Sequence, residues 1–226
     1  MIRTAGRLAV HLVTDDRVPF DRLLDVVDAA VGAGVDVVQL RAKSVSAREL
    51  LRQAVRMADV VDRRCLLLIN DRVDVAVAAR DAGARVDGVH LGQADLPPET
   101  ARRLLGADAV IGWTANSPEH RAAASALLSG TVDYLGVGVI RPTSTKPDHP
   151  PALGIDGFAA FATSTRVPCV AIGGVRLSDV APLREAGAAG VAVVSAICGA
   201  DDPAAASRAL RSAADALTLE AQEVAR

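Results

Sequence analysis

The apolar residues of this chain gather in short runs, and longer segments with a helical repeat separate these runs. Eight runs have apolar residues at consecutive positions, which is typical of parallel strands buried on both faces. These runs are 8–14, 35–40, 65–69, 86–91, 109–112, 134–139, 168–172 and 190–194. The segments between and after them predict helices over 20–33, 46–61, 73–82, 97–105, 117–128, 155–162, 177–186 and 203–217. Ser46 with Glu49, Ser117 with Pro118, and Ser178 are helix start signals.

Eight strand and helix pairs in succession predict an α/β fold, a single-domain (β/α)8 TIM barrel over residues 1–226. A doubly wound open sheet is the alternative, but it normally has a glycine-rich turn after the first strand. Residues 12–16 read Leu-Val-Thr-Asp-Asp and contain no glycine. No linker rich in proline, glycine or serine divides the chain, and residues 220–226 are interpreted as a solvated helical tail.

Composition narrows the class of protein further. Acidic and basic residues nearly balance, with a net charge of -2 and no long run of like charge, which disfavours nucleic acid as a partner. No apolar run approaches the length of about 20 residues that a membrane helix needs, and the N-terminus lacks a signal peptide pattern. Cys65, Cys169 and Cys198 lie far apart in apolar runs, which indicates buried thiols in a reducing compartment. We therefore expect a cytoplasmic protein without a membrane partner.

In a barrel of this kind, polar residues that follow the strands meet at one mouth. After the second strand, alternation puts Gln39, Arg41 and Lys43 on one side. An amide and two cations suit an anionic group, because arginine offers a planar fork of donors and lysine a mobile charge. The alternative is a solvated loop with two surface cations.

The next two strands are followed by carboxylates. Asn70 and Asp71 follow the third strand, and Asp95 follows the fourth. Two carboxylates facing a cationic pocket predict Mg2+, which commonly binds one or two carboxylates together with water and substrate phosphate oxygens. Each aspartate could instead cap the helix that follows it. His90 is interpreted as a hydrogen-bonded structural histidine in preference to a metal ligand, because no second histidine or cysteine has ligand spacing.

The later strand ends carry groups that suit phosphate. The loop 140–148 contains Thr143, Thr145 and Lys146, whose hydroxyls and ammonium could clamp a diphosphate, although such a composition also fits an exposed turn. Gly174 follows the seventh strand, and Val194 and Ser195 follow the eighth. Barrels often bind phosphate with the loops after these last two strands.

Seven short segments that contain the strand ends carry a resemblance to a known family. They are QLRAK (39–43), INDR (69–72), GVHLGQAD (88–95), GWT (112–114), YLGVGVIRPTSTK (134–146), AIGGV (171–175) and VVSAI (193–197). In order and spacing, from residue 39 to residue 197, these segments resemble the thiamine phosphate synthase family. No single motif is decisive, but seven in order are far more specific than any one of them.

The resemblance implies a transferase that couples hydroxymethylpyrimidine diphosphate to hydroxyethylthiazole phosphate. In the mechanism that the resemblance implies, diphosphate leaves first and the amino group of the pyrimidine ring stabilises the benzyl-type cation that forms. The thiazole nitrogen then attacks this cation. Such chemistry needs positive charge around the leaving group and no protein nucleophile. The resemblance also implies the role of each site residue. The diphosphate site would be formed by Gln39, Arg41, Lys43, Asn70, Thr143, Thr145 and Lys146, and the Mg2+ ligands would be Asp71 and Asp95. The thiazole phosphate site would be formed by Gly174, Val194 and Ser195, and the groups closest to catalysis would be Arg41, Thr114 and Lys146.

The chain departs from the family at a few positions. The family usually has serine where Thr114 stands, and often an aromatic residue at His11, another residue at Ala42 and a smaller one at Trp113. The last three bear on the lining of the pyrimidine pocket.

Two other functions stay open at this point. One is a thiazole tautomerase-like isomerase on a similar barrel, which would have no use for a metal and diphosphate site. The other is a non-catalytic barrel that binds a phosphorylated metabolite. The outer helices are compatible with a homo-oligomer, but the apolar pattern singles out no face for it.

Overall fold

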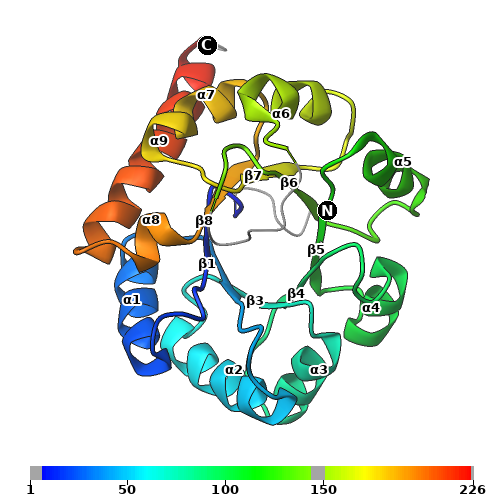
Figure 1. Ribbon diagram of the computed structural model, residues 1–226, viewed down its shortest axis with the longest axis vertical. Helices are drawn as coiled ribbons and strands as arrows, with labels where there is room; N and C mark the ends of the chain where they lie inside the picture. The colour runs from blue at the N-terminus through cyan, green and yellow to red at the C-terminus, as the bar shows by residue number, and fades with distance from the viewer. Residues whose placement is uncertain (1–6, 144–150, 225–226) are drawn as a thin grey trace.

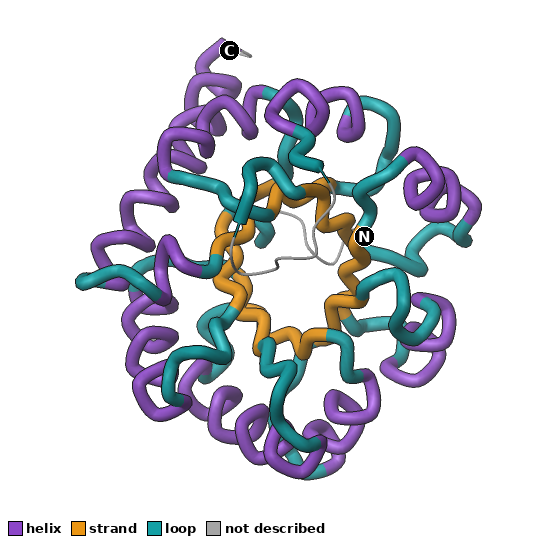
Figure 2. The backbone as a smooth tube through the Cα atoms, in the orientation of Figure 1, coloured by secondary structure: helices purple, strands orange, loops and turns teal. Residues whose placement is uncertain are grey.

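Eight parallel strands close into a barrel in the computed structural model of the chain, which describes residues 7–143 and 151–224, with side chains up to residue 216. Each strand pairs with the next, and β8 pairs with β1. The strands are β1 (Val10–Val13), β2 (Val37–Leu40), β3 (Leu66–Asn70), β4 (Gly88–Leu91), β5 (Val110–Thr114), β6 (Tyr134–Gly138), β7 (Cys169–Ile172) and β8 (Gly190–Val193). Figure 1 looks along this barrel, and Figure 2 shows the ring of strands inside a ring of helices. The predicted single (β/α)8 barrel is confirmed.

The helices lie outside the ring of strands. They are α1 (Phe20–Gly32), α2 (Ala47–Val61), α3 (Val73–Asp81), α4 (Pro98–Leu105), α5 (Pro118–Ala126), α6 (Gly154–Ala162), α7 (Val180–Glu185), α8 (Ser195–Cys198) and α9 (Pro203–Val224). Ser46 caps α2 by accepting a hydrogen bond from the Glu49 backbone N–H at 3.2 Å, and Ser117 caps α5 in the same way from His120. Both predicted start signals are confirmed.

Three details differ from the predicted helices. The segment predicted as one helix over 177–186 begins as a 3-10 turn, η1 (Leu177–Asp179), and the Asp179 carboxylate accepts the Arg176 N–H where Ser178 was expected to cap. The short helix α8 directly after β8 was not predicted, because four residues are too few to show a repeat. At the C-terminus, α9 runs on past the predicted helix end at residue 217, and the tail that was predicted to be helical is helical as far as Val224.

Two apolar layers hold the barrel together. Alternate strand residues point into the barrel, where Val13, Val37, Leu68, Val110 and Tyr134 belong to one buried cluster. The other strand residues pack outward against the helices in a larger buried cluster. Strands buried on both faces explain the consecutive apolar positions in the sequence. Within the described ranges, no helix is both long and apolar enough to cross a membrane.

Candidate active site

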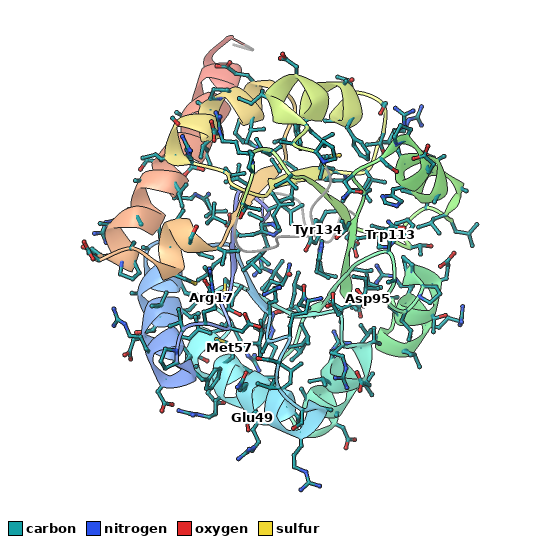
Figure 3. All side chains as sticks on the ribbon, in the orientation of Figure 1. Arg17, Glu49, Met57, Asp95, Trp113 and Tyr134 are labelled. Atoms are coloured by element: carbon teal, nitrogen blue, oxygen red, sulfur yellow. The ribbon has the colours of Figure 1, made fainter. Side chains whose placement is uncertain are left out.

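The two predicted carboxylates lie next to each other at the carboxyl ends of β3 and β4. The backbone N–H of Asp71 donates to the carbonyl of His90 at 2.8 Å, which extends the β3–β4 pairing by one residue. Lys43, from the loop after β2, places its Nζ 2.6 Å from Asp71 Oδ2. Asp95 reaches back to accept the N–H of Gly92 at 2.6 Å. Side chains from three successive loops therefore meet at one point, and Figure 3 shows Asp95 on the loop that leads to α4.

Charge accumulates at this point. Burial and a hydrogen bond to Asp71 raise the pKa of Asp95 above its ordinary value, and Lys43 opposes that shift. Burial is the first cause of this shift and the second carboxylate adds to it, because both disfavour the charged form. Two adjacent carboxylates are oxygen ligands of the kind that Mg2+ binds, so the residues present fit Mg2+. Among the described residues, groups of three or more histidines, cysteines or acids that could hold a metal are absent. Mg2+ needs only one or two carboxylates when phosphate and water complete its shell.

Neither aspartate caps a helix, which rules out the alternative interpretation of both. Helix α3 has Arg72 at its N-cap and α4 has Pro97, each without a side-chain cap. Asp71 has a φ of 64°, a left-handed conformation that is uncommon outside glycine, asparagine and aspartate. This conformation places its carboxylate toward Lys43 and Asp95.

A network of polar side chains inside the barrel forms the floor of the mouth. His90 Nδ1 lies 2.9 Å from the Tyr134 hydroxyl, and His90 Nε2 lies 3.1 Å from Thr114 Oγ1. Gln39 also hydrogen-bonds to Tyr134. Gln39, His90 and Tyr134 are buried, so these bonds hold their side chains in place. His90 is the hydrogen-bonded histidine that the sequence predicted.

Glycine at position 112 makes room for this floor. A Cβ atom there would lie 2.2 Å from Tyr134 Cζ and 2.5 Å from His90 Nδ1, closer than atoms approach. Both contacts are to large buried side chains with no space to retreat into. The glycine of the GWT segment therefore belongs to the architecture of the site.

Of the three positions expected to bear on the pyrimidine pocket, His11, Ala42 and Trp113, only His11 faces the interior of the barrel. Its ring meets Tyr134 edge to face, with centroids 5.3 Å apart. Burial, together with the nearby His90, lowers its pKa to about 3, so the ring is neutral. In contrast, Trp113 packs in the outer apolar layer and lines a cavity of about 410 Å³ between α4 and α5, and Ala42 packs against the same outer layer. Figure 3 shows Tyr134 inside the ring of strands and Trp113 on its outer side.

Arg41 lies beyond the end of β2, so strand alternation no longer governs its direction. Its guanidinium is 3.5 Å from Asp16 of the β1–α1 loop. Both residues line a cavity of about 260 Å³ beside α1 and α2. Gln39, by contrast, is still within β2 and points into the barrel, and Lys43 reaches over to Asp71.

On the other side of the mouth, the loops after β6 and β7 are tied together. The Arg141 guanidinium makes two hydrogen bonds to the buried Asp179 carboxylate, at 2.6 and 2.9 Å, and it lowers the pKa of that carboxyl. Gly174 has a φ of 66°, and a Cβ there would lie 2.7 Å from the Arg141 carbonyl oxygen. Only glycine allows this close approach of the two backbones. Thr143 follows on the same loop, whereas Thr145 and Lys146 lie outside the described residues.

The remaining predicted residues lie at the rim. Asn70 is the last residue of β3, and Thr114 is the last of β5. Val194 follows β8, and Ser195 begins α8. The described site residues thus lie within the last two residues of a strand or follow one, all at the same end of the barrel, which is where enzymes with this fold carry their sites.

Sequence reasoning missed Tyr134. It is the only tyrosine of the chain and it begins β6 at the opposite end of the strand from the mouth. The signal was a lone tyrosine in a chain with 2% aromatic residues, because a buried tyrosine needs a partner for its hydroxyl.

Comparisons with known proteins agree on one family. The family model described as thiamine monophosphate synthase matches residues 10–197. The chain is 44% identical to the thiamine-phosphate synthase of Azorhizobium caulinodans, covering 90% of this chain and 93% of that protein. It is 49% identical to that of Xanthobacter autotrophicus, covering 91% of this chain and 95% of that protein.

Solved structures extend the agreement to three dimensions. The thiamine phosphate pyrophosphorylase of Pyrococcus furiosus matches with a TM-score of 0.80 and 29% identity, over 95% of this chain and 98% of that one. A 3-hexulose-6-phosphate synthase shares the fold at a TM-score of 0.69 and 20% identity, over 90% of this chain and 98% of that one. The sequence matches cover most of this chain and most of each of the two related synthases. The chain therefore belongs to the thiamine monophosphate synthase family, a family of transferases.

Proposed function

We propose that this chain joins 4-amino-2-methyl-5-hydroxymethylpyrimidine diphosphate to 4-methyl-5-(2-hydroxyethyl)thiazole phosphate, forming thiamine phosphate and releasing diphosphate, with the reaction at the mouth of the barrel. The observation that carries this assignment to the mouth is the cluster of Asp71, Asp95 and Lys43. Lys43 Nζ lies 2.6 Å from Asp71 Oδ2, and the Asp71 and Asp95 side chains are hydrogen-bonded to each other. Two adjacent carboxylates beside an ammonium suit a metal-bound diphosphate better than they suit a simple monophosphate.

In this proposal Asp71 and Asp95 hold Mg2+, which when bound neutralises the negative charge of the diphosphate. With Mg2+ on the two carboxylates, Lys43 would be free to donate to the phosphate oxygens, and Arg41, Thr143, Thr145 and Lys146 would add donors around them. Positive charge arranged in advance around a leaving group lowers the barrier to its departure, because that is where negative charge develops. We expect no step that uses a protein nucleophile.

The floor of the mouth holds the pyrimidine. Gln39, Asn70 and Thr114 supply the polar contacts at this end, and His90 and Tyr134 keep Gln39 and Thr114 in position through the bonds described above. A neutral buried His11 beside Tyr134 keeps this region free of a charge that would oppose a ring cation. The thiazole phosphate lies across the mouth, against Gly174, Val194 and Ser195.

The two other functions fit the residues less well. A thiazole tautomerase-like isomerase needs a phosphate site but no pair of carboxylates beside a lysine. A non-catalytic binding barrel has no need for either carboxylate at the mouth. The close approach of the Asp71 and Asp95 carboxylates beside Lys43 therefore supports the synthase over both alternatives.

The surroundings of the protein follow the same reasoning. Its partners are small molecules, and we propose the cytoplasm as its compartment because its three cysteines are free thiols. Burial raises the pKa of Cys65 and Cys169 to about 12 and that of Cys198 to about 11, so none of the three is activated. Assembly into a homo-oligomer through the outer helices is part of the proposal, and light scattering of the purified protein would measure it.

The test is the release of diphosphate by the purified protein supplied with both substrates and Mg2+. We expect diphosphate and thiamine phosphate in equal amounts, and no release when either substrate is left out or when a chelator removes the metal. Tight binding of the thiazole phosphate without any release of diphosphate would contradict the proposal and favour a binding barrel or an isomerase.

A further inference from the structure

The loop after β2 carries two of the proposed diphosphate groups but has little backbone structure of its own. Strand β2 ends at Leu40 and α2 begins at Ala47, so Arg41 and Lys43 lie on a connecting segment. Backbone groups of such a segment need partners from elsewhere, and the source of those partners decides how firmly the segment is held.

Thr14 of the β1–α1 loop supplies two of those partners. Its hydroxyl accepts a hydrogen bond from the Arg41 N–H at 2.8 Å and donates one to the Arg41 carbonyl at 3.1 Å. The side chain is fully buried, and 27 residues separate it from Arg41 in the chain. One hydroxyl thus binds both backbone groups of a residue proposed to hold diphosphate.

Asp16, two residues later, holds the same loop further along. Its Oδ2 accepts the backbone N–H of Lys43 at 3.0 Å, and its Oδ1 lies 3.5 Å from the Arg41 guanidinium. Asp15 lies between Thr14 and Asp16 but points elsewhere, since its carboxylate binds Arg17 in the same loop at 2.6 Å. The three neighbouring side chains therefore divide into two that hold the β2 loop and one that does not.

We propose that Thr14 and Asp16 are positioning residues, which fix the backbone of Arg41 and Lys43 so that both cations reach the diphosphate. This inference rests on the proposed function, because it takes its purpose from the roles of Arg41 and Lys43. Neither Thr14 nor Asp16 contacts the reacting groups in it. Their effect is to remove loop freedom that the pyrimidine diphosphate would otherwise have to remove on binding.

The test separates the two substrates by their KM values. In Thr14→Val, which keeps the shape and removes both hydrogen bonds, we expect the KM for the pyrimidine diphosphate to rise by about tenfold, since small displacements of binding groups are costly. The KM for the thiazole phosphate should stay within about twofold, because its site lies across the mouth. Thr14→Ser keeps the hydroxyl and should restore most of the loss. An equal rise in both KM values, or a loss in kcat alone, would overturn the inference.

Asp16 has a more selective pair of variants. Asp16→Asn retains an oxygen that can accept the Lys43 N–H, so it should stay close to the wild type, whereas Asp16→Ala should raise the KM for the pyrimidine diphosphate. If the asparagine variant were as impaired as the alanine variant, the backbone contact would not be the one that matters. Arg17→Gln is the matched control, because it breaks the Asp15 ion pair in the same loop and leaves both contacts to the β2 loop intact.

Two further measurements distinguish this inference from the proposed function. Lys43→Ala removes a proposed diphosphate group directly and should raise the same KM. If it does and Thr14→Val does not, only the positioning inference fails. A wild-type protein that releases no diphosphate with both substrates and Mg2+ would overturn the function and this inference with it. Melting temperatures of all variants would show whether the fold is intact.

Discussion

The two ends of the barrel use the same residue type in opposite ways. At the end opposite the mouth, Asp36, Asp87 and Asp133 each stand directly before an even-numbered strand, β2, β4 and β6. Each carboxylate accepts a backbone N–H from the preceding strand, from Val10, Leu67 and Ile111 at 3.0, 2.8 and 2.8 Å. Each also pairs with an arginine, Arg211, Arg85 and Arg102 respectively. At the mouth, Asp71 and Asp95 instead lie against each other.

The difference separates stability from function. A carboxylate that receives both a backbone N–H and a guanidinium has its charge fully compensated, and it ties one strand to the next. Two adjacent carboxylates repel each other in the folded protein, and at the mouth Lys43 is the cation beside them. At one end of the barrel each aspartate therefore holds a strand N–H and an arginine of its own, whereas at the other end two aspartates lie together, which suits the binding of a further cation.

The largest effect is expected at the closed end. Asp133→Ala leaves Arg102 buried without its charged partner, and the side chains of the pair are only 6% and 15% exposed. Removing one partner of a buried pair costs about 3–5 kcal/mol of unfolding free energy. The melting temperature should fall by roughly 6–20 °C, at about 2–4 °C per kcal/mol for a chain of this size. Calorimetry measures this, and KM values that change in the folded variant would contradict the separation of the two ends.

The next effect is expected at the mouth. Asp71→Asn keeps the left-handed backbone, which asparagine tolerates, and removes a proposed metal ligand. We expect a fall in kcat/KM of about a hundredfold at saturating Mg2+, comparable with the removal of one stabilising group from a polar active site. The melting temperature should hardly change. A variant that is active in the presence of chelator would exclude Asp71 from the metal site.

An effect of intermediate size concerns His11, which lies between the two ends. The folded pKa of about 3 lies below the unfolded value of 6.5, so between these values the unfolded chain binds a proton that the folded chain does not. Stability is therefore lost as the pH falls from 6.5 toward 3, at up to about 1.4 kcal/mol per pH unit. Urea unfolding at pH 6.5 and pH 5 should show a drop about 2 kcal/mol larger in the wild type than in His11→Phe. Parallel curves for the two proteins would contradict this.

The smallest effect is expected on the outer surface. Asp21 pairs with Arg56 at 2.8 Å, but their side chains are 85% and 55% exposed. Water screens such a pair, so Asp21→Asn should change the unfolding free energy by less than about 1 kcal/mol. This variant is the control for Asp133→Ala, because both remove an aspartate from an arginine. A similar loss of stability in the two would mean that burial does not distinguish them.

Much of the fold could be predicted from local pattern. Strands buried on both faces have apolar residues at consecutive positions, which the sequence shows directly. The caps Ser46 and Ser117 each bind a backbone N–H three residues later, so the start of each helix is also visible in the local sequence. The helix α8 could not be predicted, since four residues show no repeat. The 3-10 start of the segment before α7 also depends on a distant partner, because Arg141 holds the Asp179 carboxylate.

The site divides along the same line. The sequence by itself determined that Gln39, Lys43, Asp71, Asp95 and Gly174 would gather at one mouth, because the carboxyl ends of all strands in a parallel barrel lie on one side. Only the tertiary structure decided which of these residues meet. Lys43 reaches Asp71 across 28 residues of chain, and Thr14 holds Arg41 across 27. Tyr134 rises from the far end of its strand to His90 across 44. Such contacts depend on strand register and on the space that glycines leave. Neither can be predicted from the residues that neighbour each position in the chain.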